Sequence, residues 1–393
     1  MTRSILFLLF GIDAIMLFYE TTLFSISYRE ADFLYHSSSL LNLIITTSIN
    51  LFGQNDFALR LPMVIVHLIS ALLLYKISGR YLKREHDRLW LLAVFMLIPG
   101  VNSAALLLDN SGLVIMLLLF YVTLLQRSEW VQYLFLIAVF WIDVSFAILY
   151  LGLFFYALRE KNSQLLVISL LLFSVSLYFH NYLPHGAPQG HFLDTLGLYA
   201  AIFSPIVFIY LFFVLYRRFV AHQQEVVWYL STTALISSLL LSFRQEMEIQ
   251  VFAPYLILAL PLAAQNFFHS YRVRLRPFRK NYRVLFTISF ILLLANTLVL
   301  LFHKELYRVI ERPSKHFAYR QHIAKELAEE LYRSDITCVD TGNNAMQLRL
   351  QFYGIETCEM NRFTHHRNGE AIDVTVRYKD VPVYQIYVSK THI

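Results

Sequence analysis

The chain has 393 residues, of which 57% are hydrophobic and 15% charged, and its mean hydropathy is +0.52. Soluble domains average roughly 25% charged residues, so this composition excludes an ordinary soluble domain, a disordered chain and a disulfide-rich secreted fold. The formal net charge of +6 does not indicate nucleic-acid binding, because the excess of Lys and Arg lies between apolar segments. We therefore expect a polytopic α-helical membrane protein.

Eleven apolar segments are predicted to cross the membrane, although several are short for the roughly 20 residues that a span requires. They lie near residues 4–20, 61–79, 89–108, 111–126, 131–142, 144–158, 163–180, 199–215, 226–243, 250–268 and 284–302. The first is interpreted as a retained signal anchor, because no small-residue cleavage site follows it. Residues 131–158 could form one tilted helix, but the basic residues share one side of the membrane only if they form a helix pair hinged near Asp143.

Charge placement predicts the orientation of these spans. Lys and Arg cluster at Arg3, at 80–88 and at 272–283, whereas the alternate loops carry few basic residues. The positive-inside rule then places the N-terminus in the cytoplasm and the tail after Phe302 outside. We therefore expect the C-terminal part to lie on the outer side of the membrane.

Composition divides the chain at residue 302 into a transmembrane domain, residues 1–302 with a first external loop at 21–60, and a small periplasmic α/β domain, residues 303–393. The second domain is predicted to contain helices at 314–330 and 345–352 and strands at 336–340, 355–360, 371–378 and 381–388. Cys338 and Cys358 occupy similar places in two successive predicted strands. An oxidising compartment permits a disulfide between them, and two buried free thiols are the alternative.

Acidic side chains in or beside a membrane span are costly and need an explanation. The first external loop is the richest, since Glu30 and Asp32 lie two residues apart with Arg29 and His36 beside them. A carboxylate there could act as a general base toward an acceptor hydroxyl; a solvated loop with an Arg–Glu pair is the alternative. The following apolar stretch, 40–52, suits a helix lying along the interface.

Other polar residues are candidates with structural alternatives. Asp109 is a second candidate carboxylate, or it only caps the helix that follows. His185 and His191 belong to a Pro- and Gly-containing loop and could bind phosphate or a divalent metal ion, although no third ligand is spaced to complete a metal site. No cofactor is otherwise indicated. Asp13 and Asp143 are each expected to pair with another residue within the bundle. His67 is expected to be a core residue whose ring has hydrogen-bond partners.

Four segments together resemble a known family. Tyr-Arg-Glu-Ala-Asp at 28–32 is followed by Leu-Phe-Gly-Gln-Asn-Asp-Phe-Ala-Leu-Arg-Leu-Pro at 51–62, by Asp-Asn-Ser-Gly-Leu at 109–113, and by a stretch at 244–261 that contains Ala-Pro-Tyr and Leu-Pro. This pattern resembles the GT-C superfamily of membrane glycosyltransferases, in particular the group of protein O-mannosyltransferases and the lipid A aminoarabinose transferase.

Two departures from the family pattern affect the candidate site. The group has Asp-Glu where this chain has Arg29-Glu30, and its Lys-Pro-Pro-like element is absent. The catalytic carboxylate is therefore expected at Glu30 or at Asp32, with Glu30 favoured because Glu30-Ala31 matches the family's Glu-Ala.

The resemblance implies transfer of a glycosyl group, with inversion, from a polyprenyl-phosphate-linked sugar to a lipid, glycan or protein acceptor at the periplasmic face, as in lipopolysaccharide, capsule or glycoprotein assembly. Its catalytic residues would be Glu30, Asp32 and Asp109. Its substrate-binding residues would be Arg29, His36, Arg60, His185, His191, Arg244, Glu246 and Tyr255, with Arg60 or Arg244 holding the departing phosphate. A transporter or flippase with Asp13 and Asp143 as coupling sites, and a non-catalytic GT-C-like subunit, are the alternatives.

Overall fold

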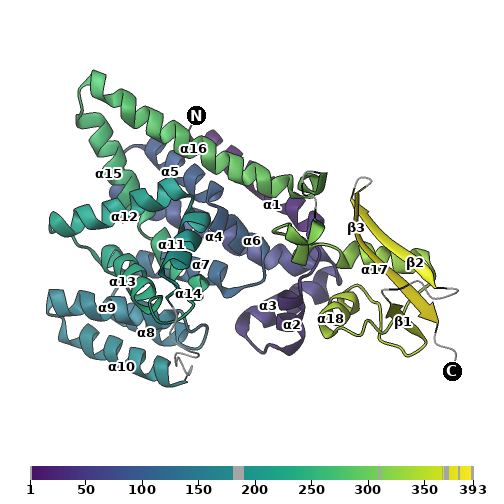
Figure 1. Cartoon of the computed structure of the whole chain (residues 1–393). Helices are drawn as coiled ribbons and strands as arrows, with labels where there is room; N and C mark the ends of the chain where they lie inside the picture. The colour runs from purple at the N-terminus through teal and green to yellow at the C-terminus, as the bar shows by residue number, and fades with distance from the viewer. Residues whose placement is uncertain are drawn as a thin grey trace. The chain divides into compact units, whose positions relative to one another are not determined.

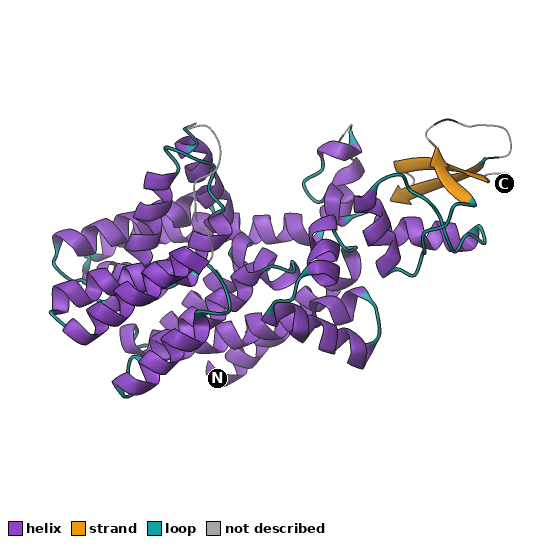
Figure 2. Cartoon of the chain, turned by 90° about the horizontal axis from the view of Figure 1, so that it is seen from below, coloured by secondary structure: helices purple, strands orange, loops and turns teal. Residues whose placement is uncertain are grey.

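The structure is a computed structural model that describes residues 2–179, 190–308, 310, 312–364, 366, 371–378 and 381–390. The described chain is mostly helical and contains one small three-stranded sheet (Figure 2). It divides into two compact units. Unit 1 comprises Met1–Ala14, Ile65–Ala105 and Asp109–Thr297, and unit 2 comprises Ile15–Val64, Leu106–Leu108 and Leu298–Ile393. Unit 2 thus contains residues 21–60, predicted to form the first external loop, together with the C-terminal segment.

Unit 1 is a bundle of helices around one extensive apolar core (Figure 1). Its helices, some of which extend into unit 2, are α1 (Thr2–Leu23), α4 (Asp56–Tyr81), α5 (Glu85–Leu97), α6 (Pro99–Leu106), α7 (Asn110–Leu124), α8 (Glu129–Val139), α9 (Phe146–Glu160), α10 (Ser163–Phe179), α11 (Phe192–Phe203), α12 (Pro205–Val220), α13 (Val226–Leu241), α14 (Ile249–Ile257), α15 (Leu260–Val273) and α16 (Arg279–Leu301). The long apolar runs in these segments account for a core that extends through the whole bundle.

Three described helices are long and apolar enough to cross a membrane: Arg3–Leu23, Asp56–Tyr81 and Arg276–Leu301. Three bent helix pairs raise this number to six if each pair is one span. They are Glu85–Leu97 with Pro99–Leu106, Phe192–Phe203 with Pro205–Val220, and Ile249–Ile257 with Leu260–Val273. Further apolar helices of 10–17 residues are shorter than a span, and the count of eleven stays a prediction.

The predicted hinge near Asp143 separates two helices, since α8 ends at Val139 and α9 begins at Phe146. The Asp143 carboxylate accepts hydrogen bonds from the backbone N–H of Ser145 at 2.8 Å and from the side chain of Asn110 at 2.6 Å. A carboxylate that binds a nearby backbone N–H competes with continuous helix formation, which explains the break.

Two buried ionisable residues of unit 1 pair with each other. The His67 Nε2 lies 2.8 Å from a carboxylate oxygen of Asp13, and the imidazole stacks on Phe95 with ring centroids 5.6 Å apart. Both side chains are buried, so the pair satisfies polar groups inside the bundle. Asp13 and His67 therefore occupy the structural positions expected for them.

Unit 2 combines short helices with the sheet. Its elements are α2 (Tyr28–His36), α3 (Leu40–Phe52), the 3-10 turns at His303–Arg308, Pro313–Lys315 and Tyr319–Gln321, α17 (Ala324–Arg333), α18 (Asn344–Phe352), β1 (Asn361–Thr364), β2 (Ile372–Tyr378) and β3 (Val381–Lys390). The strands pair antiparallel in the order β1–β3–β2, with an irregularity between Val376 and Arg377. Buried Val374, Val376 and Ile386 pack with Leu327 and Leu331 of α17, so the helix covers one face of the sheet (Figure 1).

Two sequence predictions for the C-terminal segment are wrong in detail. Residues 336–340 and 355–360 form no strand of the sheet, and pair only through isolated parallel bridges such as Cys338 with Glu356. The helix expected at 314–330 begins only at Ala324, after 3-10 turns. There the buried His316 ring lies 2.8 Å from the His303 carbonyl oxygen and accepts from the backbone N–H of Ala318, and such side-chain bonds compete with a regular helix.

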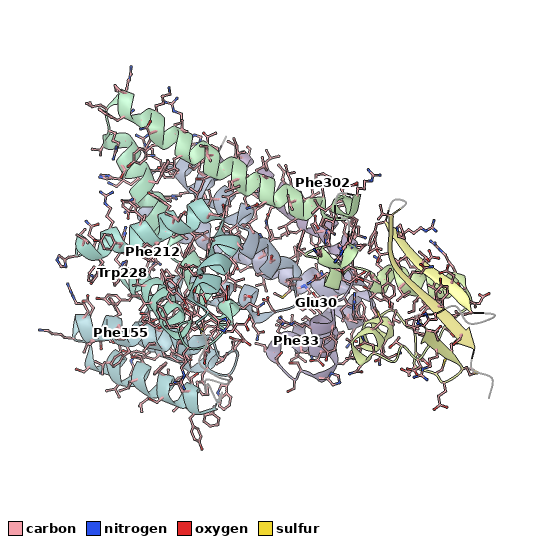
Figure 3. All side chains as sticks on the ribbon, viewed as in Figure 1. Glu30, Phe33, Phe155, Phe212, Trp228 and Phe302 are labelled. Atoms are coloured by element: carbon pink, nitrogen blue, oxygen red, sulfur yellow. A yellow bond between two sulfur atoms is a disulfide. The ribbon has the colours of Figure 1, made fainter. Side chains whose placement is uncertain are left out.

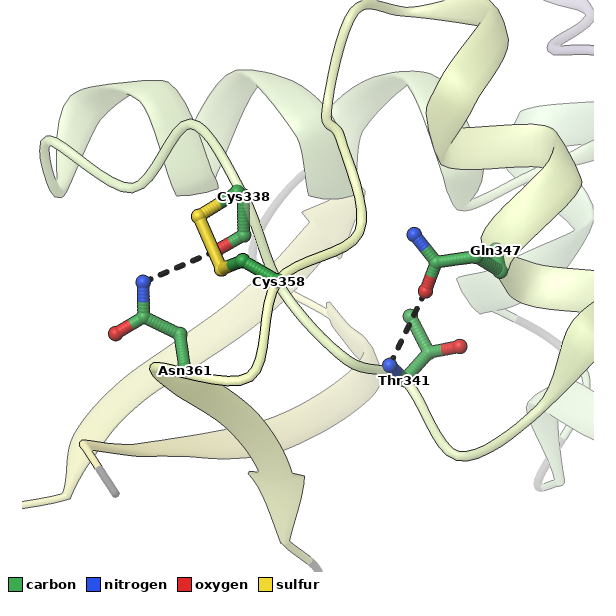
Figure 4. The surroundings of a disulfide bond; sticks show 5 residues. All are labelled: Cys338, Thr341, Gln347, Cys358 and Asn361. Carbon is green, nitrogen blue, oxygen red and sulfur yellow. Dashed lines mark hydrogen bonds between the residues drawn. A yellow bond between two sulfur atoms is a disulfide. The ribbon is translucent and has the colours of Figure 1, made fainter. Parts of the chain in front are cut away.

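Cys338 and Cys358 form a disulfide, with their Cα atoms 5.4 Å apart (Figure 4). The two segments that carry them lie side by side because the backbone N–H of Glu356 donates to the carbonyl of Thr337 and that of Val339 to the carbonyl of Glu356. Asn361 adds a hydrogen bond to the Cys338 carbonyl at 3.0 Å (Figure 4). The disulfide thus joins two segments that have few ladder hydrogen bonds of their own.

Candidate functional site

The helix that carries the predicted carboxylates, α2, begins with a capping box. The hydroxyl of Ser27 accepts from the backbone N–H of Glu30 at 3.3 Å, and the Glu30 carboxylate accepts from the backbone N–H of Ser27 at 2.8 Å. Ser and Glu at this spacing satisfy two of the N–H groups that a helix start leaves unpaired. Glu30 therefore orders the start of α2.

Glu30 is almost fully buried, with 3% of its surface exposed, among residues of unit 2 (Figure 3). Besides the Ser27 N–H, its carboxylate accepts from the backbone N–H of Leu108 at 3.3 Å and from the guanidinium of Arg60 at 3.3 Å. These donors hold a buried negative charge in place, and they leave Glu30 little freedom to meet a substrate.

Arg60, near the start of α4, is completely buried. Its guanidinium donates to the carbonyls of Leu106 at 3.0 Å, Phe24 at 3.3 Å and Ser25 at 3.1 Å, in addition to Glu30. A carboxylate oxygen of Asp56 lies 3.6 Å from the guanidinium. The guanidinium thus links three segments of unit 2. The positions of its acceptors suit the planar, multiple donors of a guanidinium better than an ammonium group.

Residues from the C-terminal segment complete this arrangement. The phenol of Tyr353 donates to Asp56 at 2.7 Å and accepts from the backbone N–H of Ile26 at 2.9 Å. Burial raises the pKa of Tyr353 well above its usual value, so the phenol stays a neutral donor beside the carboxylate. The ammonium of Lys325 lies 3.2 Å from the second oxygen of Asp56.

Arg349 of α18 adds a further link to the segment that leads into α2. Its guanidinium donates to the carbonyl of Ile26 at 2.8 Å and to the carbonyl of His322, and its side chain is buried. We call the six residues that share these contacts the anchor network. Its members are Glu30, Asp56, Arg60, Lys325, Arg349 and Tyr353.

Lys325, Arg349 and Tyr353 were not predicted from the sequence. One signal was present for Arg349, which is a charged residue between two apolar ones, Leu348 and Leu350, in a predicted helix. No sequence pattern could have paired Arg349 or Tyr353 with Ile26, because 323 and 327 residues separate them.

Asp32 and His36 differ from Glu30 in being exposed on α2, with 51% and 62% of their side-chain surfaces accessible. The Nδ1 of His36 lies 3.0 Å from a carboxylate oxygen of Asp32, one helical turn away. If Asp32 accepts the Nδ1 proton, the Nε2 lone pair of His36 is free to accept a proton from another molecule. Arg29 is also exposed on this helix.

The remaining predicted residues that the structure describes belong to unit 1. Asp109 caps α7 by accepting from the backbone N–H of Ser111 at 2.9 Å, as its structural alternative predicted. His191 lies at the start of α11, with its ring 3.3 Å from the carboxylate of Asp194. Arg244 and Glu246 are exposed between α13 and α14. Tyr255 is fully buried, and its hydroxyl donates to the Ser145 carbonyl at 2.6 Å. His185 lies outside the described residues.

Among the described residues, no group of three or more His, Cys, Asp or Glu side chains is arranged to hold a divalent metal ion. In the segment 21–60, Asp32 and His36 form a pair of polar side chains that is exposed to solvent. The chemistry that these two groups support is proton transfer and hydrogen bonding.

A cluster of buried histidines lies elsewhere in unit 2. His303, His316 and His322 are buried, and the rings of His303 and His322 stack with centroids 4.7 Å apart. Phe24 stacks on His303 at 4.3 Å. Burial lowers the pKa of His303 to about 4 and that of His322 to about 2, so both rings are neutral at pH 7. The sequence analysis did not single out these histidines.

Comparison with known proteins identifies the fold. No protein-family model and no curated protein matches the chain. Its fold is similar to that of ArnT, which agrees with the predicted resemblance at the level of fold.

Two solved structures of ArnT from Cupriavidus metallidurans carry this comparison. The apo structure has a TM-score of 0.57 and 11% sequence identity over 99% of this chain and 98% of that chain. The structure bound to undecaprenyl phosphate has a TM-score of 0.56 and 12% identity over 89% of this chain and 85% of that chain. The likeness therefore extends over most of both chains, at low sequence identity.

Proposed function

We propose that the chain is a glycosyltransferase that moves a sugar from a polyprenyl-phosphate carrier to a lipid, glycan or protein acceptor. The observation that carries this proposal is the exposed Asp32–His36 pair on α2 of a chain with the GT-C fold. Binding of undecaprenyl phosphate by the second ArnT structure supports a polyprenyl phosphate as the carrier. The apolar helices support a reaction at a membrane surface, which we place at the periplasmic face of a bacterial inner membrane.

In the proposed reaction, His36 with Asp32 acts as the general base. The acceptor hydroxyl gives its proton to Nε2 of His36, while Asp32 stabilises the imidazolium that forms. The acceptor oxygen bonds to the anomeric carbon as the bond from that carbon to the phosphate oxygen breaks. Polyprenyl phosphate leaves with the bonding electrons, and attack opposite the leaving group inverts the anomeric centre.

We assign different roles to the other predicted residues of the first external loop. Arg29 is exposed and is proposed to bind the departing phosphate, because a guanidinium matches phosphate geometry. Glu30 and Arg60 are proposed to position α2, since every contact they make lies within buried parts of unit 2. The prediction of Asp109 as a catalytic carboxylate stays part of the proposal, as do the predictions of substrate binding by His185, His191, Arg244, Glu246 and Tyr255.

The test combines a deletion strain with a purified-protein assay. We expect mass spectrometry of surface glycans and lipid A to show loss of one sugar substituent in the deletion strain, and its return with the wild-type gene. The purified protein should transfer labelled sugar from a polyprenyl phosphate carrier to an acceptor extracted from the deletion strain. Unchanged glycan and lipid A profiles in the deletion strain would contradict the proposal.

A second candidate is a non-catalytic subunit with the GT-C fold. It is favoured by one observation, that Arg29 stands where the family has an Asp and the neighbouring Glu30 is buried. In that case, Asp32→Asn, Glu30→Gln and Asp109→Asn would each leave the glycan profile unchanged, whereas deletion of the gene would alter it. The purified chain would be inert alone and would copurify with a glycan-assembly complex.

A further inference from the structure

The start of α16 carries a dense group of basic residues, and the structure separates them into two kinds. Arg272 pairs with Asp87, Arg274 lies over the ring of Tyr282 at 4.4 Å, and Arg279 donates to the carbonyls of Arg272 and Arg274. These three cations have partners within unit 1. They stabilise the turn between α15 and α16.

The other three cations, Arg276, Lys280 and Arg283, are exposed and pair with no side chain in the part of the chain that the structure describes. Arg276 lies in the 3-10 turn Arg276–Phe278, which leads directly into α16, and Lys280 and Arg283 lie in the first turns of α16. Their spacing of four and three residues places them on one face of this helical stretch. They line one surface hollow with three further residues of the same face, Val284, Thr287 and Ile288.

The same helix face continues as an exposed aliphatic stripe. Val284 is 48% exposed, Ile288 50%, Ile291 58% and Leu294 41%, at helical spacing from the cations. In the helical stretch Arg276–Leu301, only 11% of the most apolar 18-residue segment is buried inside the structure. This face therefore presents three unpaired positive charges at one end and an apolar strip about 15 Å long beyond them.

We propose that this face of α16 is a binding site for one anionic glycerophospholipid. The cations at Arg276, Lys280 and Arg283 bind its phosphate, and an acyl chain lies along the stripe from Val284 to Leu294. A phosphate satisfies three cations that lack a carboxylate partner, and basic residues next to a span attract anionic lipid headgroups.

A second copy of the chain fits this face less well. A two-fold contact through the same face would bring the three cations of each copy toward those of the other, and like charges at an interface are unfavourable. No Asp or Glu lines the hollow to neutralise them. Charge complementarity thus favours an anionic lipid over another α16.

The test measures lipid retention by the full-length protein, purified in detergent, using native mass spectrometry. We compare phosphatidylglycerol with phosphatidylcholine carrying the same acyl chains, and with glycerol phosphate. The wild-type protein should retain one phosphatidylglycerol at concentrations where neither of the other two binds. In the R276Q/K280Q/R283Q variant, half occupancy should require at least tenfold more phosphatidylglycerol.

The matched control removes equal charge elsewhere in unit 1. R127Q/R159Q/K161Q replaces three exposed basic residues that lie outside this face, and its lipid retention should stay within twofold of the wild type. Ile288→Asn should weaken retention of long-chain but not of dihexanoyl phosphatidylglycerol. If the triple variant does not fold, Lys280→Gln alone should raise the phosphatidylglycerol concentration needed for half occupancy about threefold.

Three outcomes would overturn the lipid site. One is equal retention by the wild-type protein and the R276Q/K280Q/R283Q variant, and another is equal loss in the control variant. The third is a lipid-free wild-type dimer that the R276Q/K280Q/R283Q variant converts to monomer, which would assign the face to a second copy. None of these readouts depends on glycosyl transfer, so the lipid site and the proposed function succeed or fail separately.

Discussion

Glu30 and Asp32 lie two residues apart on α2, yet their surroundings suit opposite tasks. Glu30 is buried and accepts from Ser27, Leu108 and Arg60, whereas Asp32 is half exposed and hydrogen-bonds with His36. A buried charge with several donors is a structural element, because each of those donors loses a partner when the charge is removed. A charge at the surface can be approached by a substrate.

We therefore expect Asp32→Asn to lower glycosyl transfer by about 100-fold or more, which is the usual contribution of a general base. His36→Gln should have a similar effect, and the double variant should be little worse than either single one, because the two groups act as a pair. Initial rates with the purified protein measure this. The exposed carboxylate Glu359 offers a control, since Glu359→Gln should retain full activity. Additive losses in the double variant would contradict the paired role.

Glu30→Gln should instead destabilise unit 2. The substitution removes a negative charge next to the fully buried Arg60, and loss of one partner of a buried ion pair costs about 3 kcal/mol. The midpoint of denaturant unfolding in detergent should fall. For Asp32→Asn, which changes an exposed side chain, we expect a change of less than about 0.5 kcal/mol. Equal stability of the two variants would show that Glu30 is not structural.

At the scale of elements, α2 and α18 belong to distant parts of the sequence and pack together in unit 2. Leu348 and Phe352 of α18 join an apolar cluster with Ile26, Leu41 and Ile45. The anchor network adds hydrogen bonds around this cluster, so the segment that leads into α2 is held at both backbone and side chains. A segment held in this way keeps the Asp32–His36 pair at a fixed place in unit 2.

Tyr353→Phe tests this contact with the loss of one oxygen atom. The variant removes the partner of the Ile26 backbone N–H and one of the partners of an Asp56 oxygen, and loss of the partner of a buried polar group costs about 1–3 kcal/mol. Hydrogen exchange at the Ile26 amide should accelerate by at least tenfold. Tyr332→Phe is the matched control, because the Tyr332 hydroxyl is more exposed and binds only the Tyr353 carbonyl. Unchanged exchange at Ile26 would refute the contact.

The disulfide should matter for the same unit. Cys338 and Cys358 are 20 residues apart, and closing a loop of that length restricts the unfolded chain by about 3 kcal/mol. Reduction of the disulfide, or replacement of both cysteines by Ala, should lower the denaturant concentration at which the C-terminal segment unfolds. A denaturant titration monitored by hydrogen exchange measures this midpoint. Exchange in α9, which belongs to unit 1, should stay unchanged. An unaltered midpoint would mean that the segments stay together without the disulfide.

At the scale of the whole molecule, the histidine cluster makes stability depend on pH. The pKa of His303 falls to about 4 and that of His322 to about 2 in the folded chain, whereas histidine in an unfolded chain has a pKa near about 6.5. Below that value the unfolded state binds more protons than the folded state, so stability falls as the pH falls. The titratable and charged groups around the rings are Glu20, Lys304, His316, Glu326 and Arg349.

Between pH 7 and pH 5, each of these two histidines should reduce the free energy of unfolding by about 2 kcal/mol. Thermal unfolding in detergent at several pH values measures this loss. His303→Phe keeps a ring stacked on Phe24 but removes one titrating group, and should shrink the pH dependence by about half. His366→Gln, at an exposed residue, should leave it unchanged. The same slope in wild type and His303→Phe would contradict the assignment.

Several features of this protein could be predicted from local sequence because they depend on neighbouring residues. The apolar runs predict helices, and the hairpin of β2 and β3 follows from alternating apolar residues. The two helices on either side of Asp143 were predicted from the placement of basic residues along the chain. The start of α2 likewise depends on Ser27 and Glu30, three residues apart. The family motifs around residues 28–32 and 51–62 predicted the GT-C resemblance.

What only the tertiary structure decided is the environment of each charge. The same sequence motif contains a buried Glu30 and an exposed Asp32, and the difference comes from Leu108 and Arg60, which approach from other segments. Arg349 and Tyr353 contact Ile26 across 323 and 327 residues of sequence. Arg276, Lys280 and Arg283 differ from neighbouring cations in having no side-chain partner among the described residues. Local sequence determines which helices form, but burial and pairing depend on contacts between distant segments, and these determine which charges remain free to bind or react.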